Sequence, residues 1–230
     1  MNIWQPVTAG LWSASFPLNG WENRSTALRL RDSTLAVYNP YSRIAADQLA
    51  ELQGIGRIST LIAPNHYHHL GLKPWLAQLG PLRLIASATA TSRLVQQTAL
   101  RFDRPESLAE LLPAGGAIWC PPGTRNGELW LELQDGAQRI WVVGDAFFNV
   151  ARAPKGLAGL LLRLTASVPG LRVGRTFGWL GLRDNWAYAE WLHAALRDEP
   201  PTQLIPCHGD VATGSDLAAR MSTAAFGAYE

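Results

Sequence analysis

The residues best suited to chemistry are histidines and aspartates that follow strand-like apolar runs at three separate points of the chain. They are His66, His68, His69, Asp145 and His208. Three of them stand in the short stretch HYHH (66–69), although the chain holds only five histidines. Imidazole nitrogens and carboxylate oxygens are ligands that Zn²⁺, Fe and Mn²⁺ use in proteins. Because functional loops gather at the carboxyl ends of strands, we expect these residues to converge on a metal site.

Each of these residues taken alone also has a simpler interpretation. A single loop histidine is more often solvated or hydrogen-bonded, and an aspartate after glycine often caps the next turn. Their joint occurrence after three strands favours metal binding. His193 lies in an amphipathic helical pattern and is interpreted as structural. The two cysteines, Cys120 and Cys207, are interpreted as small apolar residues.

The elements that must position these residues alternate between β-type and βα-type patterns. Strands are expected at residues 10–17, 25–30, 33–39, 57–65, 81–87, 117–123, 128–133, 139–148 and 202–210. Helices are expected at residues 45–56, 72–80, 89–99, 156–167, 185–199 and 214–226. The βαβα order in the first half predicts a partly parallel sheet, and the strands between 117 and 148 predict an antiparallel meander. The absence of repeats and linker-like tracts favours one α+β domain over residues 1–230.

Composition and charge narrow the classes of partner. A net charge of +2 gives no reason to expect a nucleic acid or an anionic membrane as partner. The most apolar segment, residues 156–168, is too short to span a bilayer and contains Arg163. One pair of cysteines and no recognisable signal peptide favour a reducing bacterial cytoplasm. We therefore expect a small-molecule substrate, no nucleic acid, no membrane, and either a monomer or a homodimer.

The order and spacing of four segments resemble those of the metallo-β-lactamase superfamily over nearly the whole chain. The segments are APNHYHHLGLKPW (63–75), PPGTRNGE (121–128), VVGD (142–145) and PCHGD (206–210). The first of them, with VVGDAFFN (142–149), is most similar to a divergent branch that carries a domain of unknown function. The resemblance implies a four-layer αββα sandwich, in which two mixed sheets pack face to face and helices cover both outer faces. It also places residues 150–182 where relatives carry elements of the substrate pocket, although a packing role is an alternative.

The chain departs from the family's metal-binding loop, which reads His-x-His-x-Asp-His followed one residue later by Gly. Anchoring on Gly71 places Pro64 at the first histidine and His66 at the second. His68 then takes the aspartate position and His69 the last histidine position. An alternative register pairs His66 and His68 with the first two histidines and puts Gly71 at the last. The first register is preferred because it preserves the glycine.

The remaining family motifs imply one divalent metal at most. Thr124, in Pro122-Gly123-Thr124-Arg125, replaces the third histidine of the first metal site, so that site keeps only His66. The second site is better preserved. Its implied ligands are His68, His69, Asp145 and His208. Zinc is the expected ion, with iron and manganese as alternatives.

The resemblance implies a hydrolase in which water attacks an ester, lactone, thioester or phosphoester bond. His66 and Asp145 are the expected catalytic residues, and His66 is expected to act as the general base. Thr124 and Arg125 are expected to bind substrate, the arginine through an anionic group, although a solvated loop arginine is the simpler alternative. A degenerate, non-catalytic binding module of the same fold is the second hypothesis, because one metal site has lost two ligands. A nuclease is disfavoured by the small net charge.

Overall fold

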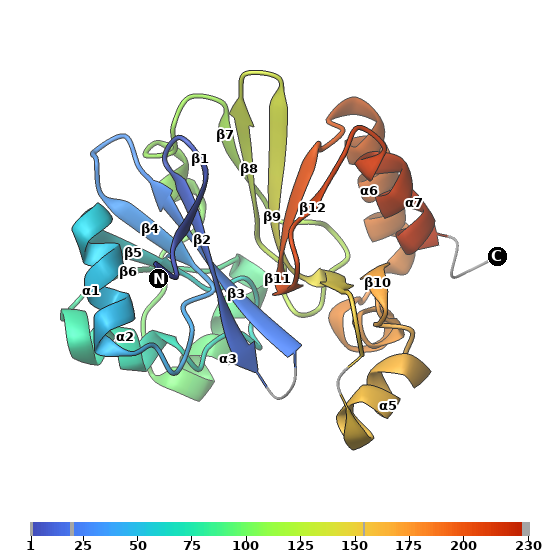
Figure 1. Ribbon diagram of the computed structural model, residues 1–230, viewed down its shortest axis with the longest axis horizontal. Coiled ribbons are helices and arrows are strands. Elements are labelled where there is room, and N and C mark those ends of the chain that lie inside the picture. Colours follow the sequence, from blue (N-terminus) through green and yellow to red (C-terminus); the bar gives the residue numbers. More distant parts are fainter. Residues whose placement is uncertain (1, 19–20, 154, 227–230) are drawn as a thin grey trace.

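The computed structural model describes residues 2–18, 21–153 and 155–226 of the chain, and Figure 1 shows the arrangement of its elements. The strands are β1 (Gln5–Thr8), β2 (Leu11–Leu18), β3 (Trp21–Arg29), β4 (Leu35–Tyr38), β5 (Ile58–Ile62), β6 (Arg83–Ile85), β7 (Gly116–Trp119), β8 (Trp130–Asp135), β9 (Gln138–Val150), β10 (Gly170–Arg172), β11 (Gln203–Gly209) and β12 (Ala212–Thr213). The helices are α1 (Ala46–Ile55), α2 (Leu72–Leu79), α3 (Ala88–Thr98), α4 (Glu106–Ala109), α5 (Gly156–Leu164), α6 (Asn185–Asp198) and α7 (Leu217–Phe226), with a π-helical turn, η1 (Phe177–Gly181).

The strands form one mixed sheet with the path β6-β5-β4-β3-β11-β9-β8-β7. β4, β5 and β6 pair in parallel, and β7, β8 and β9 pair antiparallel. Both arrangements confirm what the alternation of patterns predicted. β11 lies between β3 and β9, antiparallel to the first and parallel to the second. It therefore joins an arm made by the first half of the chain to an arm made by the second half.

The sheet curls, so that its two arms enclose a shared core. Leu28 and Tyr38 of the first arm belong to the same buried cluster as Leu131 and Val142 of the second arm. The strand β4 is buried at all four of its positions, as a strand covered on both faces must be. The apolar side chains between the arms thus hold together two halves of the chain that share few backbone hydrogen bonds.

Helices cover the outer side of each arm. Leu52 of α1, Trp75 of α2 and Leu94 of α3 pack with the first arm, whereas Leu192 of α6 and Met221 of α7 pack with the second. Figure 1 shows α1 and α2 at one side of the molecule and α6 and α7 at the other. Among the described residues, no helix is long and apolar enough to cross a membrane.

The predicted mixed sheet with outer helices is confirmed, but the prediction of two separate sheets in a four-layer sandwich is not. The reason is the position of β11. Its pairing with both β3 and β9 makes the strands one continuous, curled sheet in the part of the chain that the structure describes. That residues 1–230 form a single domain stays a prediction.

Candidate metal centre

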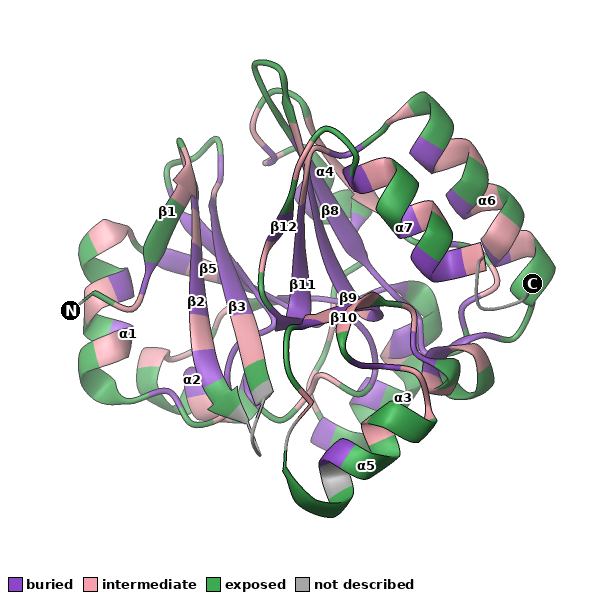
Figure 2. Cartoon of the chain, turned by 45° about the vertical axis from the view of Figure 1, so that its right-hand side comes forward, coloured by how far each residue is buried: buried purple, intermediate pink, exposed green. Residues whose placement is uncertain are grey.

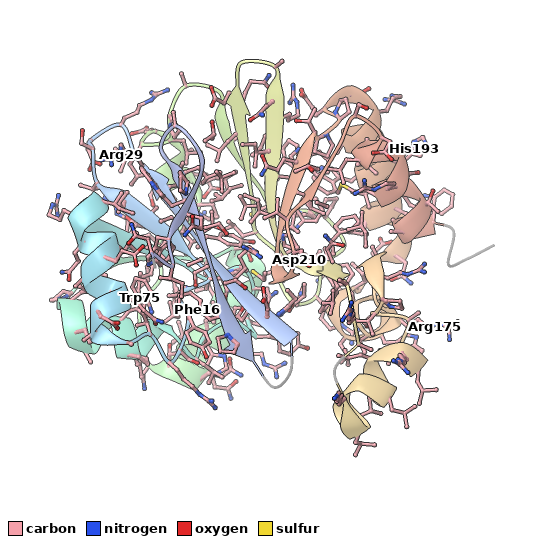
Figure 3. All side chains as sticks on the ribbon, in the orientation of Figure 1. Phe16, Arg29, Trp75, Arg175, His193 and Asp210 are labelled. Atoms are coloured by element: carbon pink, nitrogen blue, oxygen red, sulfur yellow. The ribbon has the colours of Figure 1, made fainter. Side chains whose placement is uncertain are left out.

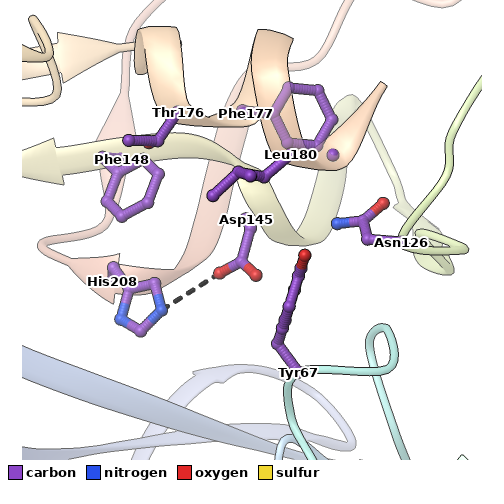
Figure 4. Close-up of a pocket in the computed structure, with 9 residues that line it drawn as sticks. Tyr67, Asn126, Asp145, Phe148, Thr176, Phe177, Leu180 and His208 are labelled. Atoms are coloured by element: carbon purple, nitrogen blue, oxygen red, sulfur yellow. Dashed lines mark hydrogen bonds and ion pairs between the residues drawn. The ribbon is translucent and has the colours of Figure 1, made fainter. Parts of the chain in front are cut away.

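Three of the predicted ligands meet where the two arms join. His68 lies in the loop after β5, Asp145 in β9, and His208 in β11. One ligand atom from each lies within 4.8 Å of the other two. The Nε2 atoms of His68 and His208 lie 2.9 Å and 3.1 Å from the same oxygen, Oδ1 of Asp145. Figure 4 shows the contact between His208 and Asp145 at the wall of a cleft.

A bulge in β9 directs Asp145 toward the two histidines. In the parallel pairing of β9 with β11, Val143 is opposite Pro206, and the next pair is Phe148 with His208. Between these two pairs β9 has four residues and β11 has one, and Asp145 is among the additional residues of β9. Bulges of this kind re-aim a side chain beside a functional site. The sequence predicted a strand over residues 139–148, with Asp145 at the end of its apolar run, and the observed strand extends from Gln138 to Val150.

The fully buried carboxylate of Glu128 holds the backbone of Asp145 in place. It accepts four hydrogen bonds, from Nδ2 of Asn65 (2.7 Å), Nδ2 of Asn126 (3.0 Å), Nε1 of Trp130 (2.9 Å) and the backbone N–H of Asp145 (3.1 Å). A Cβ at Gly144 would lie 2.7 Å from this carboxylate, so only glycine lets the bulge approach it. Glu128 thus fixes the backbone from which Asp145 projects.

Asn65 connects this support to the histidine loop. Its Nδ2 donates to Asp145 Oδ2 (2.9 Å) as well as to Glu128. Its Oδ1 accepts the backbone N–H of Tyr67 at 2.8 Å, which closes a local turn. The conformation of the loop that carries His68 is therefore tied to the carboxylate that His68 contacts.

The tautomer of His68 follows from its second partner, Asn39. Nδ2 of Asn39 donates to the carbonyl oxygen of Arg24 (2.8 Å), so its Oδ1 is the atom that faces Nδ1 of His68 at 2.8 Å. His68 must then donate from Nδ1, which leaves Nε2 of a neutral ring as a bare lone pair facing Asp145. That contact is favourable only when Nε2 carries a proton or when a cation lies between the two groups.

Electrostatics at the centre favour positive charge. Burial opposes the charged form of Asp145, but His68 and His208 hold the pKa of Asp145 well below its ordinary value. Burial would likewise lower the pKa of His68, yet Asp145 raises it overall. Burial, followed by the charge of Asp145, raises the pKa of Glu128. The two carboxylates and the lone pairs of the imidazoles therefore suit a bound cation.

His66 and His69 lie apart from this group. His69 directs its Nδ1 to the backbone oxygen of His66 at 3.3 Å and does not join the cluster of ligand atoms found among the described residues. His66 is buried, and its Nε2 has no hydrogen-bond partner there. Burial, followed by the charge of Arg93, lowers the pKa of His66 to about 4. It is therefore a neutral ring near pH 7, and it lines neither of the clefts described below.

The predicted substrate-binding residues also lie away from the cluster. Thr124 is buried, and its hydroxyl donates to the carbonyl oxygen of Pro121 at 3.0 Å. Arg125 is exposed, and its backbone N–H is bonded to Gly181 at 2.7 Å. Neither side chain lines the clefts beside Asp145. Their roles in substrate binding stay predictions.

Two clefts are lined by residues of the centre. The first, of about 230 Å³, is lined by Tyr67, Asn126, Asp145, Phe148, Phe177, Leu180 and His208, with Thr176 and Gly181. The second, of about 250 Å³, opens beside His68 and also includes Tyr67, Asp145 and His208. Figure 4 shows the Tyr67 side chain reaching into the first cleft. A small molecule in either cleft would contact Asp145.

Glu128, Asn65, Asn39 and Asn126 are site residues that the motifs did not identify. One signal was present for Glu128, because it opens the apolar run ELWLEL (128–133). A carboxylate at the start of a buried strand must be paired, since an unpaired buried charge is too costly. The three asparagines carry no such signal, because asparagine is common in loops for local reasons.

Comparisons with known proteins identify the fold. No family model and no curated protein matches the sequence. Among solved structures, a metallo-β-lactamase from Pontibacter korlensis is similar over 96% of this chain and 97% of its own, with a TM-score of 0.64 and 10% identity. The mono-zinc form of the metallo-β-lactamase FIM-1 from Pseudomonas aeruginosa is similar over 98% and 95%, with a TM-score of 0.62 and 15% identity.

VMB-1 gives a TM-score of 0.66 at 11% identity, covering 99% of this chain and 97% of its own. These structural matches span nearly the whole of both chains and therefore establish the architecture. At sequence identities this low they do not establish the reaction. The chain therefore has the fold of the metallo-β-lactamase superfamily.

Proposed function

We propose that this protein is a metal-dependent hydrolase with a single divalent ion held by His68, Asp145 and His208. The observation that carries the proposal is the approach of two imidazole Nε2 atoms to one carboxylate oxygen, at 2.9 Å and 3.1 Å. Three protein ligands with an open position are the usual protein contribution to a catalytic zinc site. Zinc is the proposed ion, with iron and manganese as alternatives.

The residues around the three ligands fit a metal. His68 donates its other ring nitrogen to Asn39, which is how metal-binding histidines are usually oriented. The second oxygen of Asp145 accepts from Asn65, so that carboxylate is also held in one orientation. The ring of Phe148 stacks on His208 with centroids 5.2 Å apart. Each ligand is thus positioned by a partner that does not itself bind the ion.

When bound, a divalent ion lowers the pKa of a coordinated water and polarises the substrate oxygen. The chain's own residues shape the remainder of the cleft. Phe148, Phe177 and Leu180 give it apolar walls. The Oδ1 atom of Asn126 is buried in the wall of the cleft, without a hydrogen-bond partner among the described residues. A substrate with an apolar group and an N–H or O–H donor beside its ester, lactone, thioester or phosphoester bond would suit these walls.

Metal binding by purified protein is the first test. Protein stripped with a chelator is titrated with Zn²⁺, Mn²⁺ and Fe²⁺ in a calorimeter, and bound metal is counted after dialysis. We expect one ion per chain, lost in the double variant His68→Ala, His208→Ala and kept in the control His193→Ala, whose ring is exposed on α6. Equal metal binding by the double variant and the wild type would refute the assignment of ligands.

His69→Ala separates the structural assignment from the sequence register. We expect this variant to keep its metal, because His69 faces the backbone oxygen of His66. Hydrolysis of chromogenic esters, thioesters, lactones and phosphodiesters is then compared between loaded wild type and the double variant. A protein that binds one ion but turns over none of these substrates would favour the alternative, a degenerate binding module. The loss of family histidines at Pro64 and Thr124 supports that alternative.

A further inference from the structure

The helix α5 presents its apolar face to solvent. Leu157, Leu160, Leu161 and Leu164 recur at helical spacing and are 72%, 53%, 53% and 64% exposed. Gly159, by contrast, is buried. Figure 2 shows α5 projecting from the arms of the sheet and coloured mainly as exposed. A surface helix normally turns such a stripe toward the core, so an exposed stripe of this kind indicates a binding surface.

The segment of the sequence that contains α5 carries charge of one sign. From Ala146 to Arg183 the sequence contains no aspartate or glutamate. It contains six cations, all of them exposed, at Arg152, Lys155, Arg163, Arg172, Arg175 and Arg183. The acidic residues that flank the segment are Asp145, in the metal centre, and Asp184, which caps α6. The net charge of +2 for the whole chain therefore conceals a segment of charge +6.

Three of the six cations lie on α5 or next to one of its ends. Lys155 is the N-cap of α5, and Arg163 lies in its last turn. The backbone N–H of Arg175 donates to Thr165 at 2.8 Å, just beyond the C-terminal end of the helix. Figure 3 shows Arg175 beside α5. Exposed leucines flanked by arginines and one lysine match a partner surface that has an apolar layer beneath an anionic one.

We propose that α5 and the cations around it bind the surface of an anionic lipid bilayer. The leucines would enter the boundary between head groups and acyl chains, as the apolar face of an interfacial helix does. The cations would contact the phosphates of the lipid head groups. A nucleic acid would bind the cations but leave the four leucines exposed to water. A second copy of the chain would cover the leucines but place like charges next to each other. The bilayer is the partner that uses both features.

The expectation that the chain has no membrane partner came from its total charge, whereas the proposal comes from the distribution of that charge. An exposed aromatic side chain, Trp179 (65% exposed), stands beside Leu180, which lines the cleft next to Asp145. The inference does not depend on the proposed hydrolase activity.

Flotation of the full-length protein with lipid vesicles, in a buffer that contains a chelator, tests the proposal. The probes are vesicles of phosphatidylcholine alone and of phosphatidylcholine with about one third phosphatidylglycerol. We expect the wild type to float with the anionic vesicles, to float far less with the neutral ones, and to be released by salt. The double variant Leu157→Gln, Leu161→Gln should bind about tenfold or more weakly. The variant Arg163→Gln should bind roughly fivefold more weakly.

The control variant Val95→Gln replaces an exposed apolar side chain on α3 and should float like the wild type. The leucine variant should keep the wild-type melting temperature, because both side chains already lie in water. No flotation of the wild type with anionic vesicles at low salt would overturn the proposal. It would also be overturned by leucine-independent binding, or by a dimer in light scattering that the leucine variant abolishes without any vesicle binding.

Discussion

The buried carboxylate of Glu128 is the feature on which the geometry of the metal centre most depends, and two substitutions there separate shape from charge. Glu128→Gln keeps the side-chain length and one oxygen, whereas Glu128→Ala removes every acceptor. We expect the alanine variant to be much less stable than the glutamine variant. The difference between the two, more than either value alone, measures the support that Glu128 gives to Asp145.

The magnitude follows from the hydrogen bonds. In the glutamine variant Oε1 can still accept from Asn65, Asn126 and the backbone of Asp145, and only the bond from Trp130 to the other oxygen is lost. A buried donor without an acceptor costs about 1–3 kcal/mol. Relief of the charge repulsion between Glu128 and Asp145 offsets part of that cost. Glu128→Gln should therefore lie within about 2 kcal/mol of the wild type.

In the alanine variant Asn126 and the backbone N–H of Asp145 lose their acceptor as well. Asn65 keeps one acceptor, because it also donates to Asp145. Two further orphaned donors correspond to about 2–6 kcal/mol between the alanine and glutamine variants. With a urea m-value of about 2 kcal/mol/M, the midpoint of unfolding should differ by about 1 M or more.

Urea unfolding followed by tryptophan fluorescence and by far-ultraviolet circular dichroism gives both midpoints. Coincident transitions establish that the two probes report one unfolding event. Equal midpoints for the alanine and glutamine variants would refute the reasoning, because they would show that the acceptor oxygens do not matter. A recovery of the alanine variant on adding formate would support it, since formate supplies the missing carboxylate.

Two further predictions concern residues outside the centre. A Cβ at Gly71 would lie 1.7 Å from the carbonyl oxygen of Pro40, so Gly71→Ala should cost about 3 kcal/mol or more, whereas Gly54→Ala, with open space around it, should be neutral or stabilising. Thermal unfolding measures both, and an unchanged melting temperature for Gly71→Ala would contradict the structure. Burial around its sulfur raises the pKa of the Cys120 thiol to about 11. At pH 8 its alkylation should thus be about 100-fold slower than that of a thiol with the ordinary value, and the rate should rise through pH 10. Peptide mass spectrometry separates Cys120 from the buried Cys207, and a rate that levels off below pH 9 would contradict the shift.

The sequence predicted the longer helices well because their signals are local, whereas the four-residue helix α4 and the turn η1 were not predicted. The expected helix at 72–80 and the observed α2, Leu72–Leu79, differ by one residue, and the amphipathic spacing ends at Gly80 in both. The short strands β1, β10 and β12 were missed for the opposite reason. Each has four residues or fewer and pairs with β2, β9 or β11. Such strands are defined by their partner and not by their own composition.

The candidate centre was partly predictable for a related reason. His68, Asp145 and His208 could be selected because each follows an apolar strand, and the structure brings these three together. His69 carries the same signal one position later, but its side chain turns to the backbone of His66. Loop geometry decides between adjacent histidines, and no spacing in the sequence reports it. That His68, Asp145 and His208 hold a metal stays a prediction.

The place of β11 in the sheet has a consequence for how the protein is made. Residues 203–209 are synthesised after both arms, yet their strand lies between β3 and β9 and supplies His208. On the ribosome, the two arms can therefore form their own hairpins and βα units before anything joins them. His68 of the first arm, Asp145 and His208 can therefore meet only after β11 has been synthesised. A chain released before residue 208 would consist of two partly folded halves that β11 does not join. Such a chain would be cleaved readily by proteases and would lack one of the proposed metal ligands.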